Sequence, residues 1–443
     1  MNLHSEYPRT LSYLFSLQKF GIKLGLSNME ALMGALGDPH LQYPSILIGG
    51  TNGKGSTAAF LDSILRESGY CVGLYTSPHL LDFRERIRID GKPIAEGEVV
   101  EGVSRLRSII STLMRREPSA AFRLLCHPTF FEVCTALAFH YFAQRKVQIA
   151  LVEVGMGGRY DATNLARCRL SIITNVDWDH QEYLGNQLGQ IAREKAGIIK
   201  EGGRVISGVT RPEAFEVIRR IALERGARLY RLGTDIIWEA HEATWGGQQI
   251  SIKGLNDTYS ELKIPLLGRH QAANAAAAAA AAEILQGLGF QITKENIAQG
   301  LAKAHWQGRM EVVSYRPLIV IDSAHNPAGA QVLARAMWDL DGYRRLYLVF
   351  GVLRDKDWKV MLEVLGPLAE RIILCRPPSE RAANPFLLRE ELSGRFQRIE
   401  VREGVGEAIS FAKSLARAED AILIAGSIFT AAEALRALEV KIL

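Results

Sequence analysis

The sequence predicts an α/β protein with two mostly parallel sheets flanked by helices, and three observations support this fold class. Short, wholly apolar stretches typical of buried strands recur along the chain and alternate with longer helical stretches. A glycine-rich loop joins one such strand to a helix near residue 50. The chain has 443 residues, and since single cores rarely grow beyond about 250–300 residues, two domains are expected.

The composition is that of a soluble globular protein. Hydrophobic residues make up 48% and charged residues 23% of the chain, with a formal net charge of +5. This mild excess does not predict a nucleic-acid partner but suits anionic substrates. Short basic runs such as Arg115-Arg116 are interpreted as solvated helix faces. Five scattered cysteines without metal-binding spacing predict reduced thiols, and no signal peptide or membrane span is recognised, so we expect a cytoplasmic protein.

The stretch from Ser45 to Thr57, SILIGGTNGKGST, organises the first domain. Ser45–Ile48 is predicted to be a strand, and a helix is predicted from about Gly55. A strand, a glycine loop and a helix start place backbone N–H groups around a phosphate, and Lys54 adds a positive charge. The loop departs from the usual GxxxxGK[ST] pattern, because Ile48 replaces the first glycine and Gly55 replaces the metal-binding hydroxyl. The alternative is an ordinary turn with a solvated lysine.

The rest of the first domain continues the alternation. Helices are expected at Thr10–Phe20, Pro128–Tyr141, Arg193–Lys200 and Gly268–Gly287, and strands at Cys71–Tyr75, Gln148–Val154, Ser171–Val176 and Ile206–Val209. Residues 236–265 change to short strands with turn residues, which predicts a small antiparallel insert.

Polar side chains follow three of these strands. Ser77, Glu153 and His180 each come after an apolar strand, and the carboxyl ends of parallel strands meet at one edge of a sheet. Oxygen ligands suit a hard cation such as Mg²⁺, and Ser77 could supply the hydroxyl that the loop lacks. The alternatives are a satisfied core carboxylate at Glu153 and a hydrogen-bonded loop histidine at His180. Spacing gives Lys195 no role, and its simplest interpretation is a surface lysine.

A second domain is predicted from residue 304, with 1–303 as the first. Strands are expected at Leu318–Asp322, Leu346–Gly351, Arg371–Cys375, Ile399–Arg402 and Ala421–Ala425. No GxGxxG follows a strand, which predicts a Rossmann-like α/β domain without a dinucleotide fingerprint. Three strand exits carry polar residues, DSAHNP (322–327), GVLRDKDW (351–358) and GSIF (426–429). They predict one wall of a cleft, with the glycine-loop domain as the other wall.

The motifs together resemble the folylpolyglutamate synthase/dihydrofolate synthase family, a branch of the Mur-type amide ligases. They follow the family's order across nearly the whole chain: GTNGKGS (50–56), YTSPHL (75–80), FRERI (83–87), TFFEV (129–133), EVGMGGRYDATN (153–164), DHQEYLG (179–185), REKAGIIK (193–200), RHQAANA (269–275), WQGRME (306–311) and DSAHNP.

The resemblance implies roles for individual residues. It implies ATP binding by Asn52, Gly53, Lys54, Gly55 and Ser56, with further nucleotide contacts from Asn274, Arg309 and Asp322. It implies one Mg²⁺ held by Ser77 and Glu153, a second held by His180, and a carbamylated Lys195 as an anionic oxygen ligand. A monovalent cation is a further expected cofactor. Glutamate is assigned to His325 and Ser427. Folate is assigned to Lys23, Leu24, Gly25, Leu26, Thr129, Phe130, Gly157, Gly158, Arg159 and Asp161. The catalytic set is Lys54, Glu153, His180, Lys195 and His325.

The implied reaction is ATP-driven amide formation through an acyl phosphate, which L-glutamate then attacks. The expected acceptors are tetrahydrofolate with its polyglutamates and 7,8-dihydropteroate, and the expected state is a monomer. A monofunctional folylpolyglutamate synthase remains an alternative, as do a cell-wall Mur ligase, a P-loop kinase or ATPase, and a non-catalytic nucleotide-binding module. Gly55 and the polar strand exits of the second domain argue against the last two.

Overall fold

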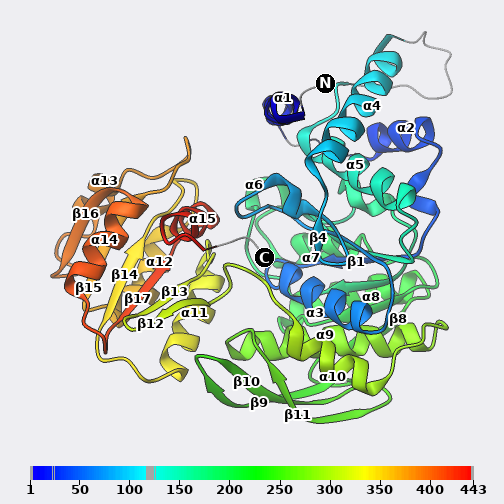
Figure 1. Ribbon diagram of the computed structural model, residues 1–443. Helices are drawn as coiled ribbons and strands as arrows, with labels where there is room; N and C mark the ends of the chain where they lie inside the picture. Colours follow the sequence, from blue (N-terminus) through cyan, green and yellow to red (C-terminus); the bar gives the residue numbers. More distant parts are fainter. Residues whose placement is uncertain (1–2, 22, 24, 116–123, 125, 441–443) are drawn as a thin grey trace. The chain divides into compact units, whose positions relative to one another are not determined.

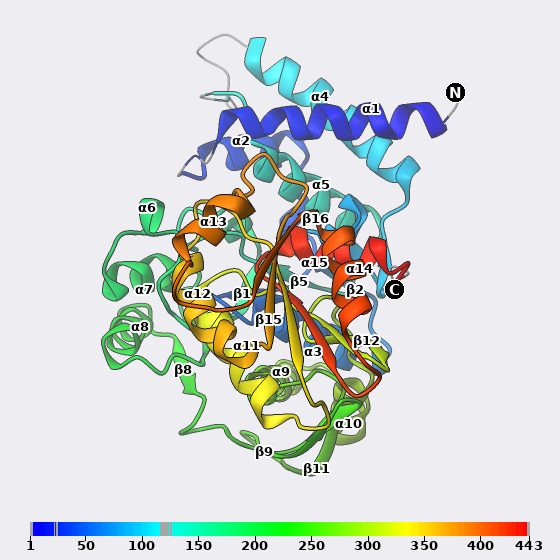
Figure 2. The same cartoon turned by 90° about the vertical axis from the view of Figure 1, so that its left-hand side faces the viewer.

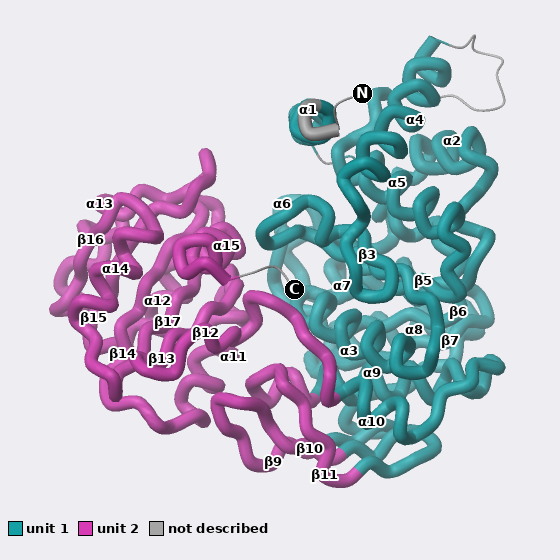
Figure 3. The backbone as a smooth tube through the Cα atoms, viewed as in Figure 1, with its two compact units in different colours: residues 1–238, 252–259, 273–301 teal, residues 239–251, 260–272, 302–443 magenta. Residues whose placement is uncertain are grey.

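The computed structural model describes residues 3–21, 23, 25–115, 124 and 126–440. The chain forms two compact units (Figure 3). Unit 1 comprises residues 1–238, 252–259 and 273–301, and unit 2 comprises residues 239–251, 260–272 and 302–443. This division passes through the predicted insert, while the predicted boundary at residues 303 and 304 stays a prediction.

Unit 1 is built on an eight-stranded sheet with the order β4-β3-β2-β5-β1-β6-β7-β8 (Figure 1). Neighbours from β2 to β8 pair in parallel, whereas β3 and β4 are antiparallel additions at one edge. The strands are β1 (Ser45–Gly49), β2 (Val72–Tyr75), β3 (Ile87–Ile89), β4 (Lys92–Pro93), β5 (Ile149–Glu153), β6 (Cys168–Ile173), β7 (Arg204–Ser207) and β8 (Arg228–Arg231). The central strands β1 and β5 are buried at every position, which explains why they are continuous apolar runs in the sequence.

The helices of unit 1 are α1 (Leu3–Ser16), α2 (Ser27–Ala35), α3 (Lys54–Glu67), α4 (Glu96–Arg115), α5 (Phe130–Gln144), α6 (Gln181–Leu184), α7 (Leu188–Ala196), α8 (Pro212–Glu224), α9 (Arg269–Gln286) and α10 (Lys294–Lys303). Helices α1, α2, α4 and α5 pack together (Figure 1). The helix predicted at 10–20 begins at Leu3 and ends in a 3₁₀ turn, Leu17–Phe20.

The helix predicted at 193–200 was placed wrongly. Helix α7 begins at Leu188 and ends at Ala196, because the chain beyond it packs tightly on a neighbouring loop. A Cβ atom at Gly197 would lie 2.4 Å from the Arg159 Cα. Only glycine fits such a close backbone approach.

The insert is a three-stranded sheet with the order β11-β10-β9. Its strands are β9 (Ile237–Thr244), β10 (Gly247–Lys253) and β11 (Thr258–Ile264). A two-residue turn joins β9 to β10, and such a connection joins antiparallel strands, as the sequence predicted.

Unit 2 is a six-stranded sheet with the order β12-β13-β17-β14-β15-β16. All pairs are parallel except β12 with β13, and the antiparallel edge strand β12 was not predicted. Figure 2 shows α11 and α12 on one face of the sheet and α14 and α15 on the other. The elements are β12 (Glu311–Tyr315), β13 (Leu318–Ile321), α11 (Pro327–Asp339), β14 (Leu346–Phe350), α12 (Trp358–Leu365), β15 (Arg371–Arg376), α13 (Pro385–Glu391), β16 (Ile399–Gly404), α14 (Val405–Leu415), β17 (Ala421–Ala425) and α15 (Ile428–Ala437).

The predicted fold class is confirmed in both units, each of which has a mostly parallel sheet between helices. Among the described residues, no helix combines the length and apolar character needed to cross a membrane.

Candidate active site

The loop after β1 forms an anion-binding cradle at the start of α3. Gly50 (φ 139°) and Gly53 (φ 83°) adopt backbone conformations that residues with side chains rarely adopt. Gly53 is the N-cap of α3 and has no side chain with which to cap the helix. The Lys54 ammonium donates hydrogen bonds to the Gly50 O (3.2 Å) and the Thr51 O (3.1 Å), so it lies over the loop. A glycine loop at a helix N-terminus, beside an ammonium, is a phosphate-binding geometry.

Residues after β6 hold this loop in shape. The Asn175 Oδ1 accepts hydrogen bonds from the Thr51 N (3.0 Å) and the Asn52 N (2.8 Å). The Thr174 hydroxyl donates to the Asn52 O at 2.6 Å. Sequence reasoning missed Thr174 and Asn175, although polar residues at a strand exit were the signal that found the other site residues.

Asn274, in the second turn of α9, lies against the loop. It is 9% exposed, and a Cβ atom at Gly53 would lie 2.6 Å from its Oδ1. Asn274 therefore stands beside the phosphate cradle, as expected for a nucleotide contact.

Gly53→Ala is expected to weaken nucleotide binding about tenfold or more. A Cβ there adds a left-handed backbone cost of roughly 1–2 kcal/mol and a clash with Asn274, which the loop can relieve only by leaving the conformation that cradles the phosphate. Titration with a non-hydrolysable ATP analogue measures the affinity. Gly69→Ala is the matched control, because Gly69 has a similar φ of 80° but no heavy atom within 4 Å. It is expected to lower stability by about 1 kcal/mol and to leave affinity unchanged; equal affinity losses in both variants would refute the role of Asn274.

Ser77, Glu153 and His180 meet at one edge of the sheet, as predicted. Glu153 is the last residue of β5 and is 5% exposed, and its Oε2 accepts a hydrogen bond from the Ser77 N at 3.1 Å. The His180 side chain is 43% exposed, with its Nε2 3.8 Å from the Asp179 Oδ2. Ser77 and His180 line the same cavity.

Lys195 is not a surface residue. It is 4% exposed, so the simplest interpretation from the sequence was wrong. Its pKa is lowered to about 7, mainly by burial and also by the Lys54 ammonium, while the carboxylates of Asp179 and Asp161 act in the opposite direction. The charges of Lys54, Asp179 and Asp161 therefore lie near enough to act on this amine.

The donor set fits hard cations once Ser77 and Lys195 are included. In the described part of the chain, no three His, Cys, Asp or Glu side chains cluster as metal ligands. An ammonium at Lys195 repels Lys54, whereas a carbamate would place anionic oxygens there. Together with the buried Glu153 carboxylate and the Ser77 hydroxyl, this supplies the oxygen ligands that Mg²⁺ prefers.

A cavity of about 330 Å³ lies beside these groups, within the range of small-molecule sites of about 300–1,000 Å³. Of the residues assigned to folate, Lys23, Gly25, Thr129 and Asp161 line it, together with Phe131 and Tyr160 from the same two segments and with Met156. Leu24 lies outside the described residues. The lining formed by the described residues does not include Leu26, Phe130, Gly157, Gly158 or Arg159.

Some of these residues have structural contacts instead. A Cβ atom at Gly158 would lie 2.8 Å from the Glu194 O, and the Arg159 N donates to the same oxygen at 2.8 Å. The loop thereby holds α7, which carries Lys195. The Phe130 ring stacks on the Phe15 ring at 5.8 Å.

Two residues that line the cavity also cap helices. The Thr129 side chain accepts a hydrogen bond from the Glu132 N and forms a capping box at the start of α5. Asp161 caps the 3₁₀ turn Ala162–Leu165 and accepts a bond from the Met156 N at 2.9 Å. Burial raises the pKa of Asp161. These bonds hold both side chains in place at the cavity wall.

The loop residues Lys23 and Leu26 also have defined contacts. The Lys23 ammonium donates to the His127 O (2.9 Å) and the Cys126 Sγ (3.1 Å). Leu26 is the N-cap of α2, where its carbonyl accepts a bond from the Glu30 N.

In unit 2 the polar strand exits share one sheet edge, as predicted, because β13, β17 and β14 are parallel neighbours. The Asp322 carboxylate accepts bonds from the Met310 N (2.9 Å) and the Ala324 N (2.7 Å). Burial raises the pKa of Asp322, and the Arg309 guanidinium opposes this shift. The His325 Nδ1 lies 3.1 Å from the Ser323 O.

Ser427 is the N-cap of α15 and is 1% exposed. Its Oγ accepts a hydrogen bond from the Thr430 N and lies 2.8 Å from the Thr430 Oγ1. The Thr430 hydroxyl donates to the Gly351 O at 2.6 Å. Ser427 therefore connects the exits of β17 and β14.

Comparisons with known proteins find the same family along most of the chain. The Mur ligase middle domain matches residues 108–282, and the Mur ligase, glutamate ligase domain matches residues 308–428. A dihydrofolate synthase/folylpolyglutamate synthase of Bacillus subtilis (strain 168) is 36% identical over 431 residues, covering 96% of this chain and 98% of that protein.

Solved structures share this fold over nearly the whole length of the chain. The Mycobacterium tuberculosis folylpolyglutamate synthase complexed with ADP has a TM-score of 0.90 and 34% identity, covering 98% of this chain and 99% of that one. The E. coli FolC in complex with DHPP and ADP has a TM-score of 0.85 and 30% identity, covering 97% of each chain.

Proposed function

This chain belongs to the dihydrofolate synthase/folylpolyglutamate synthase family of Mur-type ligases, and on that premise we propose that it joins L-glutamate to folates in an ATP-dependent ligation. The observation that carries the proposal is a chain of contacts: Lys54 over the phosphate loop acts on the buried Lys195, and Glu153 accepts a hydrogen bond from Ser77, which lines the 330 Å³ cavity. Neither a kinase nor a binding module needs a buried lysine of low pKa beside its phosphate loop.

The reaction begins with phosphate transfer to the acceptor. The carboxylate of the folate substrate attacks the γ-phosphate of ATP, which gives an acyl phosphate and ADP. Lys54 and the first N–H groups of α3 stabilise the charge on the transferred group. The amine of L-glutamate then attacks the acyl carbon, and phosphate leaves with the C–O bond electrons. Closure of the site would keep water from this intermediate.

We assign Mg²⁺ to two positions. Ser77 and Glu153 would hold one ion, and His180 with a carbamylated Lys195 would hold the second. When bound, these ions supply Lewis-acid stabilisation of the phosphate oxygens. The support is the buried Glu153 carboxylate and the electrostatic conflict between Lys195 and Lys54.

The remaining residues are assigned to the nucleotide, the incoming glutamate and the folate acceptor. We assign the nucleotide to Asn52, Gly53, Gly55, Ser56 and Asn274, and we keep the assignment of Arg309 and Asp322 to the same ligand. His325 is assigned to the incoming glutamate. Ser427 is a positioning residue, since its hydroxyl already caps α15. We place the acceptor in the 330 Å³ cavity, against Lys23, Thr129 and Asp161.

We further propose a monomeric, cytoplasmic enzyme. The five cysteines are free thiols, which fits a reducing compartment. Size-exclusion chromatography with light scattering tests the monomer, and a concentration-dependent mass near twice 49.0 kDa would refute it.

Glutamate incorporation with ATP and Mg²⁺, offering 7,8-dihydropteroate and tetrahydrofolate in parallel, tests the function. We expect product with both acceptors, because the B. subtilis relative carries both activities in its name. Product with tetrahydrofolate alone would establish a monofunctional folylpolyglutamate synthase. ATP hydrolysis at full rate without glutamate would instead support an ATPase.

A further inference from the structure

A second cavity in unit 1, of about 620 Å³, lies along α4 and does not include the phosphate cradle. We call it the α4 groove. The residues that define its chemistry are Ser104, Arg107, Ser108, Ser111, Arg115 and His127. Ser104, Arg107, Ser108, Ser111 and Arg115 recur at three- and four-residue spacing, so they share one side of the helix.

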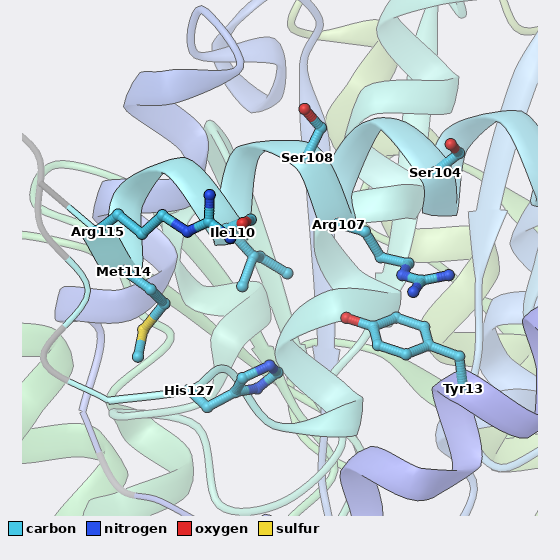
Figure 4. A pocket seen from close by; sticks show the side chains of 9 residues that line it. Tyr13, Ser104, Arg107, Ser108, Ile110, Met114, Arg115 and His127 are labelled. Carbon is cyan, nitrogen blue, oxygen red and sulfur yellow. The ribbon is translucent and has the colours of Figure 1, made fainter.

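The groove is cationic. Among the described residues, its lining contains two arginines and no carboxylate. The acidic residues of α4 (Glu96, Glu98 and Glu101) lie in the first two turns, before the groove residues begin. Figure 4 shows Arg107 beside the Tyr13 ring, with Arg115 farther along the same helix. The Arg107 guanidinium lies 4.4 Å from the centre of that ring, which holds it at the groove wall. Paired arginines with serine hydroxyls suit carboxylate groups.

The groove adjoins the proposed folate cavity. His127 lines the groove, and its carbonyl accepts a hydrogen bond from Lys23, which lines the folate cavity. The Phe20 ring stacks on the His127 imidazole at 4.5 Å. The Lys23–His127 contact thus joins the walls of the two cavities.

Chain growth explains why an anion site belongs there. The carboxylate that accepts the next glutamate must always reach the phosphate cradle. Every added glutamate therefore moves the pterin and the glutamates added before it farther from the cradle. Each internal glutamate keeps one free carboxylate, whichever of its carboxyl groups forms the amide. We propose that the α4 groove binds the carboxylates of internal glutamates in already elongated folates, which rests on the proposed folate-ligase function.

Steady-state kinetics with tetrahydrofolate monoglutamate and triglutamate tests this assignment. Arg107→Gln/Arg115→Gln is expected to raise KM for the triglutamate about threefold to tenfold, the combined effect of two exposed ion pairs. KM for the monoglutamate and kcat for both should stay unchanged. Because screening weakens exposed charge pairs, raising the salt from about 50 mM to about 300 mM should reduce the wild-type preference for the triglutamate.

Two controls separate charge from folding. Arg105→Gln removes an exposed arginine of α4 that does not line the groove, and it should change neither KM. Arg107→Lys/Arg115→Lys should retain most of the triglutamate affinity. Equal effects of the glutamine variant on both substrates, or none on either, would overturn the groove assignment while the ligase function stands. Failure of the wild-type protein to elongate either substrate would overturn the ligase function and the groove assignment with it.

Discussion

Lys54→Ala is expected to lower kcat for glutamate ligation by about a thousandfold or more. An arginine placed on the transferring phosphoryl group of GTPases contributes about 10³–10⁵ to kcat, and Lys54 is the ammonium that lies over the phosphate-binding loop here. ADP release and labelled-glutamate incorporation, measured together, report phosphate transfer and amide formation separately. Both rates should fall in parallel, because the acyl phosphate precedes the amide.

Lys92→Ala is the control for Lys54, since Lys92 is exposed on the edge strand β4. It should behave as the wild type. Near-normal ATP- and glutamate-dependent ligation by Lys54→Ala would show that the loop does not bind the reacting phosphate. Loss of amide formation with ADP release intact would place Lys54 in the second step instead.

Lys195→Ala is expected to lower the rate of glutamate ligation by a factor similar to that for Lys54→Ala. It is also expected to remove the carbamate proposed on Lys195. A neutral amine reacts with CO₂, and the pKa of about 7 leaves this buried amine neutral above neutral pH. With ¹³C-bicarbonate, the wild type should show a carbamate resonance that the variant lacks. Wild-type activity should also rise with pH through about 7 and fall when CO₂ is removed. Lys200→Ala is the comparison, because Lys200 is held by the Asn164 Oδ1 at 2.8 Å and should not carry a carbamate.

Lys195→Met separates stability from function. The folded protein releases the Lys195 proton near pH 7 and the unfolded chain near 10.5, so between these values the unfolded state binds the extra proton. The wild type therefore gains stability as pH rises from 7 to 10.5. In CO₂-free buffer near pH 7, Lys195→Met should be more stable by up to about 4 kcal/mol, measured by urea unfolding. An inactive variant that is less stable than wild type would indicate a packing role for the amine.

The central strands and the phosphate loop were predictable because their causes are local. Strands buried on both faces, such as β1 and β5, must be continuous apolar runs. The geometry of the glycine loop could be predicted from its residue types, because Gly50 and Gly53 adopt positive φ angles that glycine favours. Ser77 and Glu153 were predicted as neighbours since parallel strands end at a common edge, and they touch.

The strands at the edges of the sheets were harder to predict from the sequence. Strands β3, β4 and β12 are short, partly exposed and antiparallel, so they lack the apolar pattern that predicts a strand. The supports of the phosphate loop, Thr174 and Asn175, were missed because a polar strand exit does not tell which backbone groups it will meet.

By itself, the sequence determined the α/β class, the phosphate cradle and the family, because apolar periodicity, glycine positions and ordered motifs are properties of the chain. Only the tertiary structure decided that Lys195 is buried and that the arginines of α4 form a groove. Lys195 is enclosed because Gly158 and Arg159 hold α7 from a distant loop. The groove exists because His127 and Tyr13 approach α4 from other segments. Burial and shared walls depend on contacts between residues far apart in sequence, which local patterns do not encode.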